Sequence, residues 1–359
     1  DLNVAKRGLG SARQTSTSTI VFGGYGTAAL ATAESWDGTS WTEVGDMSAT
    51  RNQIGGAGSS NLSAIAFGGN TVTDTEEWTG AGADIGAWST STSINSVRYG
   101  GGASGIYTAA LLAGGVNDTA KVAVTESWDG SSWTEVGDLN TARTYMGSSS
   151  NAPYTASLVF GGQSSGNHAD TELWNGSSWT EVADLNTARR QISGMGISTA
   201  ALATNGYTSS ATNINESWNG SSWTETTDLN TSKTYRVGAG TQTAGIVAGG
   251  LPAGGNTETW NGTAWTEEND MNTGRYAHGG GGTQTALLVY GGDPSPAVNE
   301  DWNGSSWAEV ADLNTGRDPY GQGTGTSTNN LCIGGFTTAA VSTVEEWSGS
   351  SKTTKVLTD

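Results

Sequence analysis

Short apolar runs, each bounded by glycine, asparagine or aspartate, recur along the whole chain. In one representative stretch these runs cover residues 146–150, 156–160, 171–174 and 179–182. Apolar and polar residues alternate in the third run, which places Glu172 and Trp174 on one face of an extended segment. Four short extended segments separated by turn residues predict one antiparallel sheet of four strands.

The same four-segment pattern occurs eight times. The stretch from Thr125 to Arg143 reads TESWDGSSWTEVGDLNTAR and returns with small changes along the chain. All 15 tryptophans fall in this register, two in each unit except the last, where Lys352 stands at the second tryptophan position. The units cover residues 1–45, 46–92, 93–137, 138–183, 184–227, 228–269, 270–311 and 312–359. Self-similarity at a period of roughly 42 to 50 residues is typical of propellers and other repeat arrays.

The repeats also predict how the sheets assemble. A twisted four-stranded sheet cannot bury both faces alone, so neighbouring sheets must stack and the array must close into a ring. We therefore predict an all-β fold, an eight-bladed β-propeller of four-stranded blades that forms a single domain over residues 1–359. Tryptophan rings should fill the space between blades, and first strands rich in Gly, Ser and Ala should line the crowded inner radius. Residues 341–347 and 352–358 should complete the last blade, so that closure rests on packing between the first and last blades.

Composition narrows the choice of partners. The net charge is -19 with only 15 basic residues, which argues against nucleic acid and against anionic lipid as partners. Since no apolar run reaches 18 residues, we expect no membrane insertion. The single cysteine, Cys332, lies in an apolar run and should be a buried, unreactive thiol. The chain starts inside a repeat without a methionine, and we expect it to be part of a longer protein.

Charged residues recur once in every unit. A glutamate lies two residues before each first tryptophan, at Glu34, Glu76, Glu126, Glu172, Glu216, Glu258, Glu300 and Glu345. A basic residue precedes each first strand, at Lys6, Arg51, Arg98, Arg143, Arg189, Lys233, Arg275 and Arg317. One of each per unit indicates a repeated structural ion pair within the blade. The alternative is a ring of charges that binds a multivalent anion or a metal.

A double glycine follows the second strand in seven units, at residues 23–24, 68–69, 114–115, 161–162, 249–250, 291–292 and 334–335. Together with the glutamate, the paired tryptophans and the basic residue, this pattern resembles the kelch repeat. The sequence differs in using Trp where that family usually has Tyr, and Asn205–Gly206 replaces the glycine pair of the fifth unit. The WNGSSWTEV motif also resembles kelch-like repeats in virion and tail-fibre proteins of marine bacteriophages. These resemblances imply a propeller with partner-binding loops and an extracellular or virion location.

The loops after the second strands differ from unit to unit, whereas those after the third strands are nearly constant. Antiparallel topology places the loops after strands two and four on one face, so recognition should use that face. The candidate binding residues there follow the basic residue of each unit: Arg7, Asn52, Gln53, Tyr99, Tyr145, Arg190, Gln191, Tyr235, Tyr276, Asp318 and Tyr320. Tyrosines beside amide and guanidinium groups suit sugars or extended peptides. The alternative is that these residues only line the channel mouth.

Motifs for catalysis or metal binding are scarce in the sequence. The two histidines, His168 and His278, belong to the fourth and seventh units, three blade steps apart, so we expect no shared metal site. The sequence has no HExxH motif, no zinc-type cysteine pairs and no GK[ST] phosphate loop. We predict no cofactor. Calcium is conceivable in acidic loops such as Thr73–Glu76, although their residues have no defined ligand spacing.

These observations favour a non-enzymatic recognition module, extracellular or borne on a virion such as a phage tail or fibre. Its expected partner is a glycan or protein on a host surface, bound through the variable loops. One alternative is a structural or decorating virion protein that contacts other virion proteins. The other is a carbohydrate-active enzyme of the sialidase or sugar-isomerase kind.

Overall fold

The computed structural model describes residues 2–3, 5–15, 18–36, 39–44, 46–47, 49–60, 63–69, 75–78, 87–294 and 297–349. All regular elements among them are β-strands, and these strands form eight antiparallel sheets. The all-β class and the eight repeated sheets predicted from the sequence are therefore confirmed. The chain divides into two compact units, residues 1–86 with 350–359 and residues 87–349. Among the described residues, no helix has the length and apolar character needed to cross a membrane.

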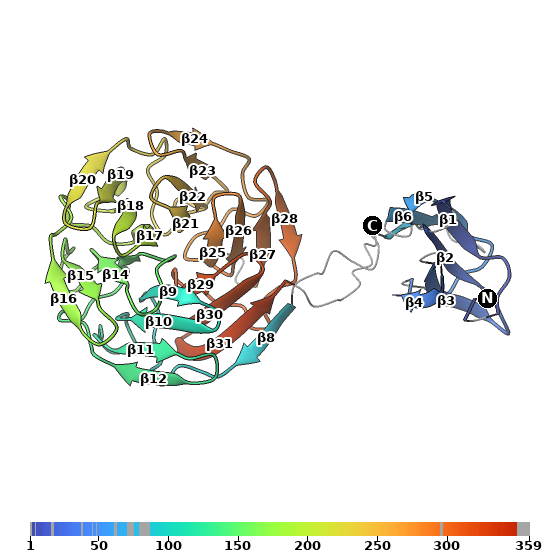
Figure 1. Ribbon diagram of the computed structural model, residues 1–359, viewed down its shortest axis with the longest axis horizontal. Coiled ribbons are helices and arrows are strands. Elements are labelled where there is room, and N and C mark those ends of the chain that lie inside the picture. The colour runs from blue at the N-terminus through green and yellow to red at the C-terminus, as the bar shows by residue number, and fades with distance from the viewer. Residues whose placement is uncertain are drawn as a thin grey trace. The chain divides into compact units, whose positions relative to one another are not determined.

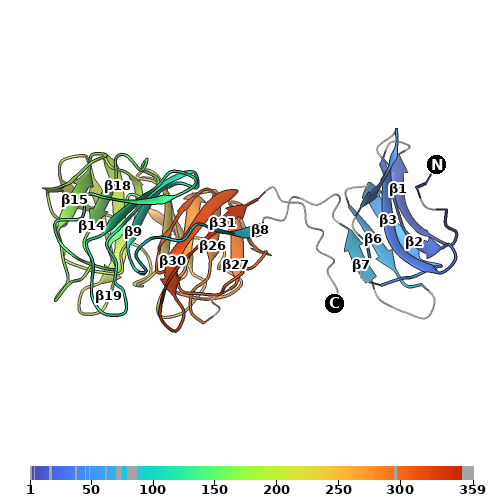
Figure 2. The ribbon, with the colours of Figure 1, turned by 90° about the horizontal axis from the view of Figure 1, so that it is seen from below.

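Residues 87–349 form a ring of four-stranded blades around a common centre (Figure 1), the place of the central channel in a propeller. The first blade comprises β9 (Gly102–Ile106), β10 (Ala109–Ala113), β11 (Thr125–Trp128) and β12 (Trp133–Val136). The second comprises β13 (Gly147–Ser148), β14 (Leu158–Phe160), β15 (Thr171–Trp174) and β16 (Trp179–Val182). The third comprises β17 (Ser193–Ile197), β18 (Ala200–Tyr207), β19 (Ala211–Trp218) and β20 (Trp223–Thr226). The next two comprise β21 (Val237–Thr241), β22 (Ala244–Ala248), β23 (Thr257–Trp260) and β24 (Trp265–Glu267); and β25 (Gly279–Thr283), β26 (Ala286–Tyr290), β27 (Asn299–Trp302) and β28 (Trp307–Val310). In each of these five blades the strands run outward from the centre of the ring in chain order, and Figure 2 shows the ring from the side.

The sixth blade closes the ring with a strand from far away in the sequence. It contains β29 (Gly323–Gly325), β30 (Asn329–Phe336) and β31 (Ala340–Ser348), and its outer strand is β8 (Ala87–Ser91). The backbone register pairs Trp347 with Trp88, as Trp128 pairs with Trp133 inside one repeat. Closure therefore rests on a hydrogen-bonded strand, and the predicted closure by packing between the first and last of eight blades is wrong. Residues 352–358, predicted to provide the outer strand, lie outside the described residues.

An insertion in the second unit explains this exchange. Nine residues separate Trp78 from Trp88, whereas four separate the paired tryptophans of the other complete units, such as Trp128 and Trp133. A short hairpin holds its two strands side by side, but a longer connection allows the fourth strand to join another sheet. The closed ring therefore contains six of the eight sheets, and the predicted single domain of eight blades divides into two compact units.

The unit of residues 1–86 contains the other two sheets. One has four strands, β1 (Gly10–Thr15), β2 (Ser18–Tyr25), β3 (Ala29–Trp36) and β4 (Trp41–Val44). The other has three, β5 (Gly55–Ser60), β6 (Ser63–Phe67) and β7 (Thr75–Trp78). Ile20 and Phe22 of the first sheet pack with Ala64 and Ala66 of the second in one buried cluster.

Tryptophans fill the spaces between blades of the ring, as predicted. The rings of Trp174 and Trp179 lie 5.3 Å apart and pack with Leu111 of the preceding blade. The indole of Trp179 donates to the hydroxyl of Thr125 in that blade at 3.0 Å, so its polar atom is also satisfied. Burial of these large rings against a neighbouring sheet stabilises the stack of blades.

Glycine is required where inner strands approach one another. A Cβ added to Gly194 on β17 would lie 2.2 Å from the Ser148 carbonyl oxygen on β13. The crowding predicted at the inner radius is therefore confirmed at this position. Gly161 and Gly162 after β14 have φ values of 64° and 101°, and Asn205 takes the first of these places in the third blade at 47°. Asparagine tolerates this left-handed conformation better than most residues, which explains the substitution.

Candidate functional site

Buried ion pairs brace the blades. The predicted partners meet in Lys6–Glu34, Arg98–Glu126, Arg143–Glu172, Arg189–Glu216, Arg275–Glu300 and Arg317–Glu345. Each glutamate also holds the segment that enters its blade; Glu216, for example, accepts the backbone N–H of Asn186 at 2.7 Å. These contacts within each blade support the structural pair over a charged binding ring. The side chain of Glu76, the predicted partner of Arg51, lies outside the described residues.

The fourth blade of the ring departs from the predicted pairing. Arg236, not Lys233, forms the ion pair with Glu258, and its Nη1 lies 2.8 Å from Oε1. Lys233 instead donates from Nζ to the Pro252 carbonyl oxygen at 2.8 Å. An arginine three residues later can take over because its longer, forked side chain reaches Glu258 and also donates to the Asn256 carbonyl at 2.8 Å. The prediction for Lys233 is therefore wrong.

Beyond the ion pairs, the chain passes around the channel mouth in a left-handed conformation. Tyr145, Gln191, Tyr235 and Tyr320 have φ values of 57°, 59°, 55° and 52°. Neighbouring blades are joined here by backbone bonds, from Tyr145 N–H to Gly100 O and from Gln191 N–H to Tyr145 O, both 2.7 Å. Such φ values are uncommon for bulky residues and concentrate at functional sites. Equivalent backbone positions therefore present large side chains at one place on the ring.

These side chains meet as a tyrosine cluster, defined as Tyr99, Tyr145, Tyr235, Tyr276 and Tyr320. The centroids of contacting rings lie 5.2–6.4 Å apart, in tilted and edge-to-face arrangements. Each of the five is half-buried. Burial raises the pKa of Tyr145 and of Tyr320, so both hydroxyls stay protonated at neutral pH and can donate hydrogen bonds. The cluster thus combines an apolar surface with polar groups.

Charged and polar groups flank the cluster. The guanidinium of Arg190 lies 4.4 Å from the ring centre of Tyr207 and donates to the Asn167 side chain at 2.8 Å. Tyr276 donates to the Asp293 carboxylate, which raises the pKa of this tyrosine to about 12. Burial, followed by the charge of Asp293, raises the pKa of Asp318 to about 6. Both signs of charge are therefore available beside the aromatic surface.

Backbone bridges place these residues at the loops that follow the second strands. Tyr99 pairs with Val116, Arg190 with Tyr207, and Tyr276 with Asp293. The expected meeting of the variable loops with the positions after the basic residues is therefore seen in the ring. The sequence did not reveal that the tyrosines touch one another, because contact depends on the ring's diameter and on the left-handed backbone.

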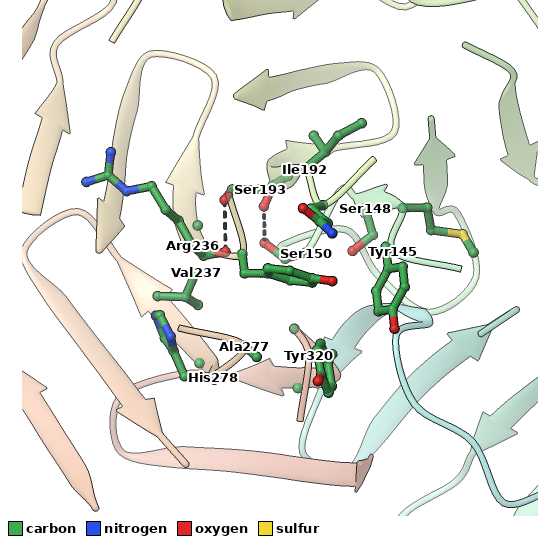
Figure 3. Close-up of a pocket in the computed structure, with 18 of the residues that line it drawn as sticks. Tyr145, Ser148, Ser150, Ile192, Ser193, Arg236, Val237, Ala277, His278 and Tyr320 are labelled. Carbon is green, nitrogen blue, oxygen red and sulfur yellow. Dashed lines mark hydrogen bonds between the residues drawn. The ribbon is translucent and has the colours of Figure 1, made fainter. Parts of the chain in front are cut away.

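A small polar cavity lies beneath the cluster. It has a volume of about 50 Å³ and is lined by residues that include Tyr145, Ser193, Arg236, His278 and Tyr320 (Figure 3). Within it Ser193 donates to the Arg236 carbonyl at 2.9 Å. This volume accommodates a few water molecules. A larger ligand would have to bind on the outer side of the tyrosines.

The loop between β13 and β14 crosses the channel below this cavity. Asn151 donates from its backbone to the Gly196 carbonyl at 3.1 Å and from its side chain to the Gly282 carbonyl at 3.2 Å. Thr324 of the sixth blade donates to Gly105 O at 2.7 Å and lies 3.4 Å from Ser150 O. These bonds tie blades one, two, three, five and six together across the ring. The second blade therefore supplies a brace that the repeat pattern does not contain.

The remaining candidates belong to residues 1–86. Arg7, Asn52 and Gln53 line a hollow of about 300 Å³ together with Tyr25. The Arg7 guanidinium lies 5.4 Å from the Tyr25 ring centre, and Gln53 N–H donates to the Gly8 carbonyl at 2.6 Å. This unit thus repeats, within itself, the combination of a left-handed residue, a guanidinium and a tyrosine.

The two histidines occupy different environments, in the second and fifth blades of the ring. His278 is buried with Nε2 3.1 Å from the Ala248 carbonyl oxygen. Burial, followed by the charge of Arg275, lowers the pKa of His278 to about 3, so it stays neutral under ordinary conditions. His168 is hydrogen-bonded inside the loop between β14 and β15. No cluster of three or more His, Cys, Asp or Glu side chains suited to a metal occurs among the described residues. Residues 73 and 74 of the acidic loop considered for calcium lie outside that part of the chain.

No family model and no curated protein matches the chain. Among solved structures, one titled "Structure of YjhT" matches with a TM-score of 0.61 and 13% sequence identity, over 75% of this chain and 99% of that chain. The fold is a β-propeller. Identity this low shows shared architecture alone, so the function of this chain must be argued from its own residues.

Proposed function

We propose that the protein is a recognition module that binds a glycan or protein surface through the tyrosine cluster and the loops around it. The observation that carries the proposal is the contact of five half-buried tyrosines at one end of the channel. Three of them are held in left-handed backbone, a conformation that costs roughly 1–2 kcal/mol for a residue with a Cβ. The same left-handed turn recurs at Gln191 and Ala277, so the backbone that joins neighbouring blades also fixes the places from which these tyrosines project.

The chemistry of the cluster favours a carbohydrate. Tyrosine rings offer flat apolar faces to the C–H groups of a sugar, and their hydroxyls donate to its oxygens. Arg190 and Gln191 add further donors, and Asp293 and Asp318 add acceptors. The cavity beneath, at about 50 Å³, is far smaller than the roughly 300–1,000 Å³ of pockets that enclose drug-sized ligands. The ligand would therefore lie across the mouth of the channel rather than inside it.

The proposed family and location rest on the repeated sequence motif and on the net charge. The double glycines with positive φ and the glutamate–arginine pairs support membership of the kelch-like propellers. Together with the WNGSSWTEV motif, they support a location outside the cell or on a virion, such as a phage tail or fibre. A net charge of -19 suits a soluble surface that avoids nucleic acid. Glycans or proteins of a host surface are the partners we propose.

The test is binding of the purified chain to a glycan array and to host cells, with and without calcium. We expect specific binding that falls at least tenfold in Tyr145→Ala and Tyr235→Ala, since removal of an aromatic anchor costs more than about 1.4 kcal/mol. The matched control is Tyr107→Ala, an exposed tyrosine in the β9–β10 turn, on the opposite face of the ring. Its binding should equal that of the parent protein.

Two results would count against recognition by this face. Equal binding by all three variants would place the ligand elsewhere on the molecule. Absence of binding in both calcium conditions would favour a structural or decorating role in a virion. Thermal melting of each variant separates a loss of binding from a loss of fold.

A further inference from the structure

The loop from Gln163 to Asp170, between β14 and β15, brings a serine, a histidine and an aspartate into one hydrogen-bonded line. Ser164 Oγ contacts Nε2 of His168, and Nδ1 of His168 lies 2.7 Å from Oδ2 of Asp170. The order of contacts is hydroxyl, imidazole, carboxylate. The same order activates the nucleophile of serine hydrolases, which is recognised by geometry and not by sequence position.

The carboxylate determines which histidine nitrogen carries the proton. Asp170 can only accept at Nδ1, so the hydrogen of a neutral His168 lies on that nitrogen. The lone pair of Nε2 is then directed at Ser164 Oγ and can take its proton. Arg143 Nη1 lies 3.5 Å from the same Asp170 oxygen and places a positive charge beside the carboxylate.

Main-chain bonds to other segments hold His168 and Asp170 in place. His168 N–H donates to the Gly162 carbonyl at 2.9 Å, and the His168 carbonyl accepts from Arg189 N–H at 3.0 Å. The Asp170 carbonyl accepts from Gly161 N–H at 3.0 Å. A site fixed on both sides by main-chain bonds needs little reorganisation when a substrate arrives.

The site is accessible and lies beside the proposed binding face. The side chain of His168 is 19% exposed and that of Asp170 is 32% exposed. Ser164 is half-buried. Arg190 donates at 2.8 Å to Asn167, the residue before His168, and so holds a positive charge next to the loop.

The repeat architecture does not account for this arrangement. Only two histidines occur in the chain, and His278 lies inside the core of another blade. The repeated braces of the fold, the glutamate–arginine pairs and the paired tryptophans, do not include Ser164 or His168. The loop is therefore a feature of one blade alone, where a specific activity can be placed without disturbing the repeat.

We propose that Ser164 is the nucleophile of an esterase site that cleaves short-chain carboxylic esters, such as O-acetyl groups. Ser164 Oγ attacks the ester carbonyl while His168 Nε2 takes the hydroxyl proton, and the alcohol leaves with that proton. Water then attacks the acyl-serine, His168 accepts a proton from the water, and the carboxylic acid departs as Ser164 regains its proton. Arg190 supplies positive charge for the transient oxyanion. The open setting suits a small acyl group carried on a larger molecule.

The first experiment treats the full chain with a fluorophosphonate probe and maps the adduct by mass spectrometry. We expect modification of Ser164 in the parent protein and in Ser165→Ala, a change of the exposed neighbour in the same loop. We expect none at this position in Ser164→Ala and a strongly reduced adduct in His168→Gln. An unmodified Ser164 in the parent protein, or equal labelling in His168→Gln, would overturn the proposal.

The second experiment measures hydrolysis of p-nitrophenyl acetate by the same four proteins. The rate should fall by roughly 10²–10⁴ in His168→Gln, the range expected for loss of a general base, at least as far in Ser164→Ala, and should be unchanged in Ser165→Ala. A rate retained in Ser164→Ala would assign the hydrolysis to other surface groups and refute the site. Circular dichroism melting confirms that each variant is folded. This substrate carries no sugar, so the result does not depend on glycan binding at the tyrosine cluster.

Discussion

Replacement of Arg236 tests whether this residue, and not Lys233, forms the buried ion pair of its blade with Glu258. The repeat register assigns the ion pair of this blade to Lys233, yet Arg236 forms it, with Nη1 2.8 Å from Glu258 Oε1. Both side chains of this pair have 0% exposure. We predict that Arg236→Ala destabilises the protein far more than Lys233→Ala does.

The magnitude follows from what each substitution leaves behind. Arg236→Ala leaves the Glu258 carboxylate buried without its cation, and removal of one partner of a buried pair typically costs about 3–5 kcal/mol. It also removes the bond to the Asn256 carbonyl. Lys233→Ala removes one bond, from Nζ to Pro252 O, and should cost about 1–2 kcal/mol. At about 2–4 °C per kcal/mol for a unit of this size, the expected falls in melting temperature are about 6–20 °C and 2–8 °C.

The pH dependence adds a second test of the same pair. Burial raises the pKa of Glu258, but the charge of Arg236 and several hydrogen bonds outweigh it and hold the pKa below its ordinary value. The stability that this depressed pKa contributes is present above the unfolded value of 4.5 and is lost as the pH falls through the lower folded value. In Arg236→Ala the opposing charge is gone, burial dominates, and protonation should stabilise the fold. The stability gap between parent and variant should therefore begin to narrow above pH 4.5, where the variant gains stability, and narrow further below it, where the parent loses stability.

Thermal and urea unfolding of the parent protein and both variants, at pH 7 and at pH 3.5, would measure these differences. Glu225→Ala serves as a control, because Glu225 lies opposite a buried glutamate in the neighbouring blade but is itself exposed. It should change stability by no more than about 0.5 kcal/mol. A larger loss in Lys233→Ala than in Arg236→Ala would refute the assignment. A stability difference between the parent protein and Arg236→Ala that stays constant with pH would also refute it.

Three further predictions follow from the fold. Gly194→Ala should lower the free energy of unfolding by roughly 3 kcal/mol, because its Cβ would lie 2.2 Å from the Ser148 carbonyl oxygen. Gly166→Ala, with open space around the added Cβ, should be nearly neutral in the same unfolding assay. Asp318→Asn should be more stable than the parent protein at pH 7. Burial raises the pKa of Asp318 from 3.8 to about 6, so the parent protein loses stability as the pH rises from about 4 to about 6, and the gain in the variant should vanish below about pH 4; a gain that persists at pH 3.5 would contradict this account. A fragment of residues 87–349 should melt cooperatively, whereas residues 93–349, without β8, should melt at a clearly lower temperature; equal melting would show that β8 does not close the ring.

The sequence predicts the repeated parts of this protein because each repeat contains the same local information. The strands begin and end near the expected residues, the paired tryptophans lie opposite each other, and the glutamates find the basic residue of their own unit. The double glycines adopt positive φ, as turns after the second strands require. All of these features depend on short-range geometry or on one blade against the next.

The candidate site was predicted as a set of positions but not as an arrangement. The sequence predicts the tyrosines as candidates because they follow the basic residue of each unit, on the face that carries the variable loops. Their mutual contact requires blades far apart in sequence to converge on one axis. The line of Ser164, His168 and Asp170 was missed because no established motif has that spacing, although a histidine in one variable loop was a visible signal.

The sequence by itself determined the all-β class, the eight four-strand repeats, the tryptophan packing and most of the ion pairs, because these follow from patterning within one unit and its neighbour. Tertiary structure alone decided that the ring closes through β8 and that Arg236 replaces Lys233. Near-identical strands can pair with one another equally well in several combinations, so the repeat pattern does not specify which ones meet. Which strands and side chains pair depends on the length of the connections, the diameter of the ring and the reach of each side chain. These factors act only once the blades are assembled.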